Sequence, residues 1–353
     1  MTMTLSLRIK TLCGSCHLMQ LRKKSSVLKP QKQICKSVLE HFDEVYSKEL
    51  GESWTRAREV MLSPSSWQYA VMLNRFSFSE GLEAYFQNQG LSDIFHDVQV
   101  PSSGWLKCYV SRIAHRYPAQ RHQQGRLKDY YLLNAASLLP VLALEVEGGN
   151  HVLDMCAAPG GKSLAILQYA MPGNLVCNEP DCLRRKRLKE MLESFLPELC
   201  RSAVTLSNLD GREFGQLHPE VYDKVLVDAP CSNDRSWLFT SDIPQARHWI
   251  ASRKELPVLQ VELIRSGIAA LRPGGILVYS TCTLSQSENS NVVDQILQSD
   301  CGVELQNLDK MAHAFSDIFT FSANTQYGLL VLPDRERAWG PMYVARFKKR
   351  YPP

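Results

Sequence analysis

From residue 150 onward, short apolar segments typical of β-strands alternate with segments of helical spacing. This alternation predicts an α/β fold with a mostly parallel, doubly wound sheet. Ligands of such sheets bind beyond the carboxyl ends of the strands. We expect strands at 151–155, 174–178, 203–207, 224–227 and 275–280, helices at 162–171, 181–195, 255–271 and 285–297, and a late antiparallel pair of strands at 328–333 and 342–347.

A glycine-containing turn follows the first of these strands, in the sequence Asp154-Met-Cys-Ala-Ala-Pro-Gly-Gly-Lys162. It is not a Walker A loop, because that motif needs glycine where Cys156 stands, and it is not GxGxxG. Gly160 and Gly161 favour close approach of the backbone to a ligand. The turn is therefore a candidate cofactor site.

Acidic residues end the next two strands, with Glu179 after the second and Asp210 after the third. An acid at the end of the second strand can hold a ribose diol. Carboxylates at three successive strand ends repel a triphosphate but suit a nucleoside with a cationic appendage. The pattern predicts S-adenosyl-L-methionine as the cofactor.

Two cysteines also follow strands, Cys231 in Asp228-Ala-Pro-Cys-Ser232 and Cys282 in Tyr279-Ser-Thr-Cys-Thr283. A buried cysteine is most often a small apolar residue. Two of them at the ligand edge of one half-sheet, beside a methyl-donor turn, instead indicate covalent catalysis. The residues alone do not decide which thiol attacks.

Together, the motifs DMCAAPGGK, DAPCS and STCT resemble those of the Sun-family RNA cytosine-5 methyltransferases, from about Tyr130 to the carboxyl terminus. The resemblance implies a Rossmann-like class I methyltransferase fold with a smaller helical and mixed amino-terminal RNA-binding region. Within the family, the sequence DAPCSNDRSW, the short amino-terminal region and the leader are most similar to a mitochondrial branch that acts on methionine tRNA. The implied substrate is the anticodon-loop wobble cytosine of mitochondrial methionine tRNA, in the mitochondrial matrix.

The resemblance also assigns roles to residues. Cys282 would add to carbon 6 of cytosine so that carbon 5 can accept the methyl, Cys231 would resolve the covalent adduct, and Asp228 would hydrogen-bond the cytosine edge. It implies no metal. The residues implied in cofactor binding are Cys156, Ala157, Ala158, Pro159, Gly160, Gly161, Lys162, Glu179, Arg184, Asp210 and Asp228.

One segment departs from the family. A glycine-rich stretch commonly follows DAPCS, and here the sequence is Asn233-Asp234-Arg235-Ser236-Trp237. The sequence therefore does not predict the geometry of the substrate loop. The expected reaction is unchanged.

Basic residues are concentrated at the amino terminus, because the first 39 residues contain eight Lys or Arg and no acid. Residues 1–32 have the composition of a mitochondrial targeting segment, with a disordered basic tail as the alternative. A lone Cys13-x-x-Cys16-His17 within it is weak evidence for zinc. We expect three parts: the targeting segment 1–32, an RNA-binding region 33–128 and a methyltransferase domain 129–353.

The amino-terminal region reads as helical over 36–48, 54–62 and 67–76. Residues 99–128 contain no acid but six Lys or Arg, interleaved with Trp105, Tyr109 and Tyr117. Cations that meet phosphates and rings that stack on bases suit RNA; a solvated basic loop is the alternative. The longest nearly apolar stretch, 135–144, is too short to span a bilayer, so we expect no membrane partner.

Three other functions compete with methylation of a tRNA. The same chemistry on mitochondrial ribosomal RNA would use the same residues. A non-catalytic RNA-binding assembly factor would not need both cysteines, Asp228 and the complete turn. A methyltransferase for a protein or small molecule would not need two cysteines at strand ends. The sequence predicts neither a protein partner nor an oligomeric state.

Overall fold

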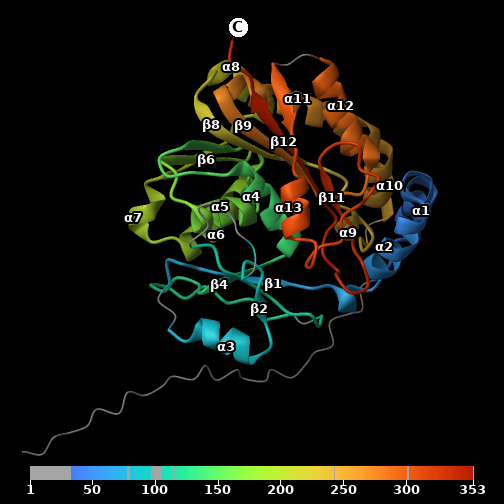
Figure 1. Cartoon of the computed structure of the whole chain (residues 1–353), viewed down its shortest axis with the longest axis horizontal. Helices are drawn as coiled ribbons and strands as arrows, with labels where there is room; N and C mark the ends of the chain where they lie inside the picture. Colours follow the sequence, from blue (N-terminus) through green and yellow to red (C-terminus); the bar gives the residue numbers. More distant parts are fainter. Residues whose placement is uncertain are drawn as a thin grey trace, which may run out of the picture. The chain divides into compact units, whose positions relative to one another are not determined.

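The main sheet has eight strands in the order β10-β12-β9-β8-β5-β6-β7, with β11 paired to β12, in this computed structural model (Figure 1). Strands β9, β8, β5, β6 and β7 are parallel, and β12 is antiparallel to β9, β10 and β11. The predicted α/β class and mostly parallel sheet are confirmed. Its strands are β5 (His151–Asp154), β6 (Asn174–Asn178), β7 (Val204–Ser207), β8 (Tyr222–Asp228), β9 (Leu271–Thr281), β10 (Val303–Gln306), β11 (Leu329–Val331) and β12 (Met342–Lys349).

The structure describes residues 33–352 except 78–79, 97, 99–104, 115, 242 and 300–301, so the predicted targeting segment lies outside it. In this part of the chain no helix is long and apolar enough to cross a membrane. The α-helices are α1 (Lys36–Leu50), α2 (Glu52–Leu62), α3 (Leu82–Asn88), α4 (Leu139–Leu144), α5 (Gly161–Tyr169), α6 (Cys182–Phe195), α7 (Glu198–Arg201), α8 (Phe214–Leu217), α9 (Asp234–Trp237), α10 (Ile243–Ser252), α11 (Leu256–Ala270), α12 (Ser290–Gln298) and α13 (Asp309–Ala314).

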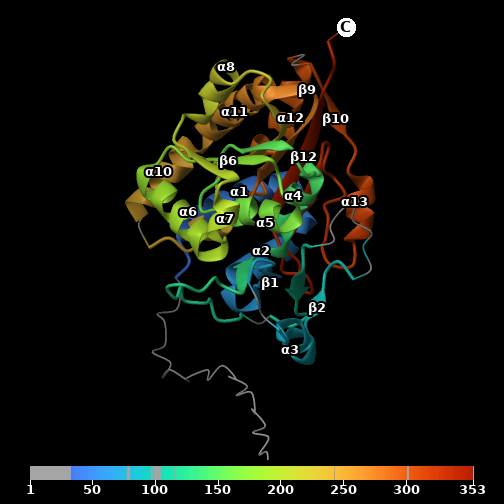
Figure 2. The ribbon, with the colours of Figure 1, turned by 90° about the vertical axis from the view of Figure 1, so that its left-hand side faces the viewer.

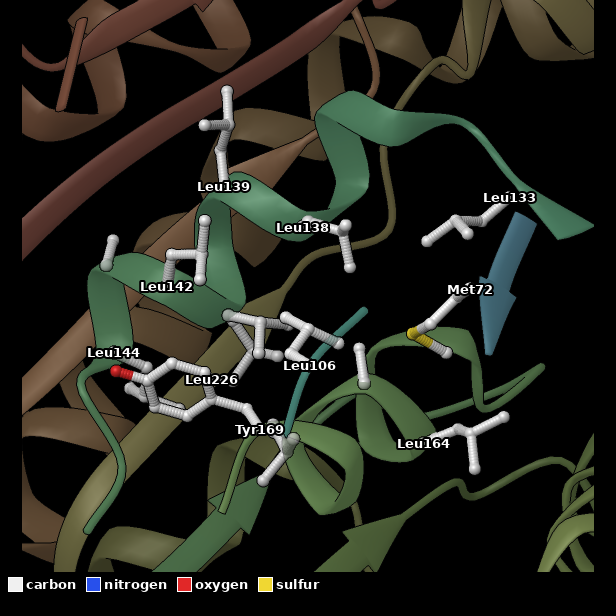
Figure 3. Packing of buried hydrophobic residues seen from close by; sticks show 14 of the residues in the cluster. Met72, Leu106, Leu133, Leu138, Leu139, Leu142, Leu144, Leu164, Tyr169 and Leu226 are labelled. Atoms are coloured by element: carbon white, nitrogen blue, oxygen red, sulfur yellow. The ribbon is translucent and has the colours of Figure 1, made fainter. Parts of the chain in front are cut away.

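Two apolar cores lie on the two faces of the main sheet. Helices α4, α5 and α6 contribute to one core, and α1, α2, α11 and α12 contribute to the other (Figures 1 and 2). Successive side chains of a strand point to opposite faces. Leu226 accordingly packs into the first core beside Leu142 and Tyr169 (Figure 3), whereas Val225 and Val227 pack into the second. Both faces are thereby buried, as the predicted parallel sheet requires.

A second, antiparallel sheet has the order β2-β3-β1-β4, with β1 (Ala70–Leu73), β2 (Ser92–Asp93), β3 (Cys108–Val110) and β4 (Tyr130–Leu133). The helix predicted over 67–76 is wrong, since β1 occupies its centre. Val71 and Met72 are both buried but in different cores, so β1 is covered on both faces. A short continuous apolar run of this kind cannot be told from a helix by its spacing.

The small sheet joins the predicted amino-terminal region to the rest of the chain. Strand β4 lies just after the predicted 128/129 boundary and pairs with β1. Residues 34–353 form one compact unit.

Two of the three aromatic residues predicted to face RNA lie in the core of the small sheet. Tyr109 is 2% exposed and Tyr117 is 8% exposed, and both pack around Phe86. Their predicted stacking on bases is therefore wrong, since only Trp105, which is 66% exposed, presents its ring to solvent. Part of the predicted basic stretch, 99–104 and 115, lies outside the described residues.

Candidate active site

The predicted cofactor turn connects β5 to α5. The amide of Ala157 donates to the Asn178 carbonyl at 2.9 Å, so the turn is attached to the end of β6. Gly160 has a φ of +106°, and a Cβ there would collide with Met191 and lie 2.7 Å from Leu188 Cδ1. A Cβ on Gly161 would lie 3.0 Å from the Tyr131 hydroxyl. Glycine is favoured at both positions by the backbone conformation and by the packing of neighbouring side chains. The sequence analysis had instead explained these glycines by the close approach of a ligand.

Glu179 and Arg184, which the sequence analysis assigned to cofactor binding, form an ion pair beside this turn. Glu179 is 2% exposed and its Oε2 lies 3.1 Å from Arg184 Nη1. Arg184 Nη2 also donates to the Ala158 carbonyl at 3.0 Å. One guanidinium therefore holds the acid at the end of β6 against the turn at the end of β5.

Buried acceptors without donors line the same region. Asp154 Oδ2 accepts from the Ser163 hydroxyl at 2.5 Å, but Asp154 Oδ1 is buried with no partner. Asn178 Oδ1 is likewise buried and unpartnered, while its Nδ2 donates to the Met155 and Leu209 carbonyls. Buried acceptors are normally satisfied. Spare acceptors and acids together fit the predicted cofactor, which carries an ammonium, hydroxyls and an amine.

Asp210 differs from the other predicted cofactor residues in already having a strong partner. Arg212 Nη2 lies 2.6 Å from Asp210 Oδ2, and Arg212 Nε lies 3.0 Å from both oxygens. These bonds lower the pKa of Asp210. Its carboxylate is therefore directed to Arg212, and within the described part of the chain it makes no hydrogen bond or ion pair with the turn.

The two predicted catalytic cysteines lie side by side. Cys231 Sγ is 3.4 Å from Cys282 Sγ, and the Cys282 amide donates to Cys231 Sγ at 3.3 Å. Both are free thiols and neither is fully buried. The hydrogen bond with Cys282, together with burial, raises the pKa of Cys231 well above its ordinary value. Cys231 therefore remains a thiol, which leaves Cys282 as the sulfur that can accept its hydrogen bond.

Asp228 joins the cysteine pair to the cofactor turn. Its Oδ2 accepts from Lys162 Nζ at 2.7 Å and its Oδ1 accepts from the Ser280 hydroxyl at 2.8 Å. Burial disfavours the Lys162 ammonium, but the Asp228 carboxylate raises the pKa of Lys162 overall. The predicted cytosine-binding acid is thus held between Ser280 of β9 and Lys162, the last residue of the turn.

A buried carboxylate that the sequence analysis did not single out holds the first cysteine loop. Glu288 is 0% exposed. It accepts the Ser232 amide at 2.9 Å and the Ser232 hydroxyl at 2.5 Å. Gln260 Nε2 and Arg253 Nε each lie 3.2 Å from it. Because Ser232 follows Cys231, this network fixes the position of that thiol.

A second buried acid, also not predicted, holds the loop that carries Cys282. Asp234 accepts the Leu284 amide at 2.7 Å and the Thr283 hydroxyl at 3.0 Å. Asn233 before it adopts a φ of 39°. Asparagine tolerates this left-handed conformation, which accounts for its place where the family has glycine. No spacing marks Asp234 or Glu288, since their partners come from distant parts of the chain.

The burial of Asp154 predicts a pH dependence of stability. Desolvation raises its pKa to about 7 in the folded protein, whereas an unfolded chain has about 3.9. As pH rises from about 4 to 7, the unfolded state loses this proton first, so stability falls. Relative to the wild type, the unfolding free energy of Asp154→Asn should rise by on the order of 3 kcal/mol between pH 5 and 8. The measurement is the difference between the melting temperatures of the two proteins across this pH range.

The matched control is Asp317→Asn, which changes an exposed acid. Its melting temperature should follow that of the wild type across the same range. Parallel curves for Asp154→Asn and the wild type would contradict the prediction.

Comparison with known proteins identifies the family of this chain. A family model described as "16S rRNA methyltransferase RsmB/F" matches residues 141–348. The mouse mitochondrial tRNA (cytosine(34)-C(5))-methyltransferase is 53% identical over 93% of this chain and 94% of its own length. The mouse 5-cytosine rRNA methyltransferase NSUN4 is 36% identical over 93% and 92%.

Among solved structures, NSun6 from Pyrococcus horikoshii has a TM-score of 0.64 at 18% identity and covers 91% of this chain and 100% of its own. That likeness supports the fold. The match to the family model and the identity to full-length relatives establish more. This chain belongs to the RsmB/F family, the Sun-type RNA cytosine-5 methyltransferases that its three motifs resemble.

Proposed function

We propose that this protein transfers a methyl group from S-adenosyl-L-methionine to carbon 5 of cytosine 34 in a mitochondrial tRNA. The observation that carries the proposal is the cysteine pair, with 3.4 Å between the two sulfurs, at the edge of the sheet that also carries Asp228. The relatives named for cytosine 34 of tRNA, from mouse and zebrafish, are 53% and 51% identical. The relative named for ribosomal RNA is 36% identical, which makes ribosomal RNA the weaker candidate.

The residues of the turn would hold the cofactor, with Glu179 and Asp154 as its acidic partners. Bound there, S-adenosyl-L-methionine supplies an electrophilic methyl group. The chain excludes water from this side of the site, because Asp154 is 1% exposed and Glu179 is 2% exposed. Arg184 keeps Glu179 in place through their ion pair of 3.1 Å.

The cysteine pair divides the covalent chemistry between two sulfurs. The Cys282 thiolate adds to carbon 6 of cytosine, a bond from sulfur to carbon forms, and the electron pair makes carbon 5 nucleophilic. After carbon 5 has accepted the methyl, its proton passes to water, the electron pair of that bond forms the carbon 5–carbon 6 double bond again, and the bond to Cys282 breaks to return the thiolate. Cys231 is a thiol beside that bond and assists its release. Asp228, held between Lys162 and Ser280, accepts a hydrogen bond from the amino edge of the base.

The surface around Trp105 is the part of the amino-terminal region best suited to RNA. A hollow of about 330 Å³ is lined in part by Arg75, Lys107 and Trp105. The Arg75 guanidinium lies 5.9 Å from the Trp105 ring, and its Nε and Nη2 are buried without partners. An exposed ring beside a cation suits stacking of an unpaired base. Further along the chain, Arg112, Arg116, Arg121 and Arg126 are exposed. Exposed cations of this kind suit phosphates.

The protein acts in mitochondria in this proposal, because its first residues are basic and its relatives from mouse and zebrafish are named mitochondrial. The matrix, where tRNA is found in this organelle, is the compartment that the substrate requires. Methionine tRNA remains the specific substrate expected from the sequence resemblance. Mapping 5-methylcytosine in mitochondrial tRNAs methylated by the purified protein tests both the position and the tRNA.

Substitution of the two cysteines separates their roles. Cys282→Ala should lose methyl transfer by at least about 10³-fold, because no covalent adduct forms. Cys231→Ala should still form the adduct and retain RNA in a band that survives denaturing electrophoresis. The measurements are incorporation of labelled methyl into the tRNA and the fraction of protein in that band.

The double variant Cys231→Ala/Cys282→Ala is the control, and it should trap no RNA. A trapped band in the double variant, or full activity in Cys282→Ala, would remove Cys282 from the role of nucleophile.

Trp105→Ala tests the RNA surface. Loss of one stacked base costs about 1–3 kcal/mol, so KM for the tRNA should rise by at least about fivefold while kcat stays within about twofold. Ile113→Ala is the control, because this side chain is 78% exposed on the same segment and lies outside the hollow. An unchanged KM for Trp105→Ala would exclude a base from this position.

A further inference from the structure

A buried residue with a hydroxyl group follows each cysteine of the pair, Ser232 after Cys231 and Thr283 after Cys282. Both hydroxyl residues are 0% exposed. Ser232 Oγ lies 2.9 Å from Thr283 Oγ1, which is within hydrogen-bond distance. The two loops therefore meet at two neighbouring places, at the sulfurs, which are 3.4 Å apart, and at these hydroxyls.

Ser232 is fixed by the carboxylate of Glu288. The Ser232 amide donates to this carboxylate at 2.9 Å and the Ser232 hydroxyl donates to it at 2.5 Å. Glu288 in turn accepts from Gln260 and Arg253, each at 3.2 Å. A hydroxyl group has one hydrogen to donate. Because Ser232 gives its hydrogen to Glu288, Ser232 Oγ accepts the hydrogen bond from Thr283.

Thr283 is held from several directions. Besides Ser232 Oγ, its Oγ1 lies 3.0 Å from Asp234 Oδ1, 3.1 Å from the Ser285 amide nitrogen and 3.2 Å from the Tyr46 hydroxyl. The amide of Ser285 donates to Thr283, and the single hydrogen of Thr283 is shared between the oxygens of Ser232 and Asp234. Turning the Thr283 side chain away would break several buried hydrogen bonds, each of which is costly to lose.

The hydroxyl contact limits how far the two sulfurs can separate. A thiol is a weak donor and a weak acceptor, so the contact between Cys231 and Cys282 is a weak link between the loops. The contact between Ser232 and Thr283 lies one residue further along each loop, and adjacent Cα atoms are only about 3.8 Å apart. The stronger hydroxyl bond therefore holds the weaker sulfur contact in place.

We propose that Ser232 and Thr283 are positioning residues for release of the methylated RNA. Their hydroxyl contact holds the Cys231 thiol against Cys282 Sγ. There the thiol donates a hydrogen bond to that sulfur as the bond to carbon 6 breaks and its electron pair returns to the sulfur. Neither hydroxyl touches the base. The inference rests on the proposed function, which takes Cys282 as the nucleophile and Cys231 as the thiol that assists release.

Thr281 offers a matched control on the other side of Cys282. It is also 0% exposed, and its hydroxyl donates to Asn289 Oδ1 at 2.6 Å. Asn289 belongs to the chain that follows β9, so this bond does not join the Cys282 loop to the Cys231 loop. Thr281→Val and Thr283→Val therefore each remove one buried hydroxyl, but only the second breaks the link between the loops.

Release of RNA from the covalent adduct is the first measurement. With S-adenosyl-L-methionine and tRNA present, Thr283→Val should lower kcat about tenfold, the effect of one buried hydrogen bond, and should raise the fraction of protein that retains RNA in denaturing electrophoresis at least about fivefold. The methyl transferred in the first turnover should stay at the wild-type amount, because the adduct still forms. A loop that was merely misfolded would lower this first turnover as well.

Three further variants distinguish the hydroxyl link from a general effect on the loop. Thr283→Ser keeps the hydroxyl and should release RNA like the wild type. Thr281→Val should also release RNA like the wild type. Ser232→Ala removes the hydroxyl on the other loop and should behave like Thr283→Val, which covers the case in which the valine variant does not fold.

Formation of a disulfide between Cys231 and Cys282 measures the sulfur contact without RNA or cofactor. Diamide takes two electrons and two protons from a pair of thiols, becomes a hydrazine and leaves a disulfide. The two sulfurs must approach to about 2.05 Å, so the rate depends on how closely the fold holds them. Mass spectrometry of the purified full-length protein should show this disulfide forming about tenfold more slowly in Thr283→Val, and at the wild-type rate in Thr281→Val.

The proposal is overturned if the wild type methylates RNA and the folded Thr283→Val and Ser232→Ala variants retain no more RNA than Thr281→Val does. Equal rates of disulfide formation in all these proteins would overturn it as well. In both cases the proposed function stands. If no RNA is methylated even by the wild type, the proposed function fails and the release role fails with it, whereas slower disulfide formation in Thr283→Val would still show that the hydroxyls hold the sulfurs together.

Discussion

The buried carboxylate of Glu288 is the interaction on which the geometry of the site depends. Taking a carboxylate out of water costs several kcal/mol unless donors surround it. Glu288 receives an amide and a hydroxyl from Ser232, and side-chain donors from Gln260 and Arg253. Arg253 in turn donates to the Tyr46 hydroxyl at 2.6 Å, which reaches Thr283 at 3.2 Å. The Glu288 carboxylate is therefore the centre of a hydrogen-bond network. This network connects helices α1 and α11 with both cysteine loops.

This network acts on loops that the sheet has already brought together. Strands β8 and β9 are parallel neighbours, and their register places Asp228 opposite Ser280. Cys231 follows the first of these residues by three positions and Cys282 follows the second by two. Strand register thus brings the two sulfurs to the same end of the sheet. The buried acids Glu288 and Asp234 then hold the two loops through hydrogen bonds. In this arrangement the two sulfurs lie 3.4 Å apart.

Sequence reasoning succeeded where local pattern determines the structure. Strand–helix alternation predicted the parallel strands, and the residues after them were predicted to bind the cofactor or to act in catalysis. The structure brings Glu179 against Arg184 and Cys231 against Cys282, two contacts that the sequence did not predict. It failed where tertiary burial decides, as at β1, whose two covered faces give no alternation. Tyr109 looked like a stacking residue because the sequence does not show that Phe86 covers it. Asp234 and Glu288 have no local signal, since each is recognisable only through partners that folding brings to it.

The segment that leads into the small sheet packs against the methyltransferase domain near helix α9. Trp67, just before β1, lies under the Arg235 guanidinium. The next residue, Gln68, accepts the Ala338 amide at 2.8 Å, and the Ala338 carbonyl accepts from Arg235 at 2.6 Å. The environment of this cation is therefore built from the start of β1, the loop before β12 and helix α9. These contacts, with the pairing of β1 and β4, join the amino-terminal region to the methyltransferase domain in the compact unit 34–353.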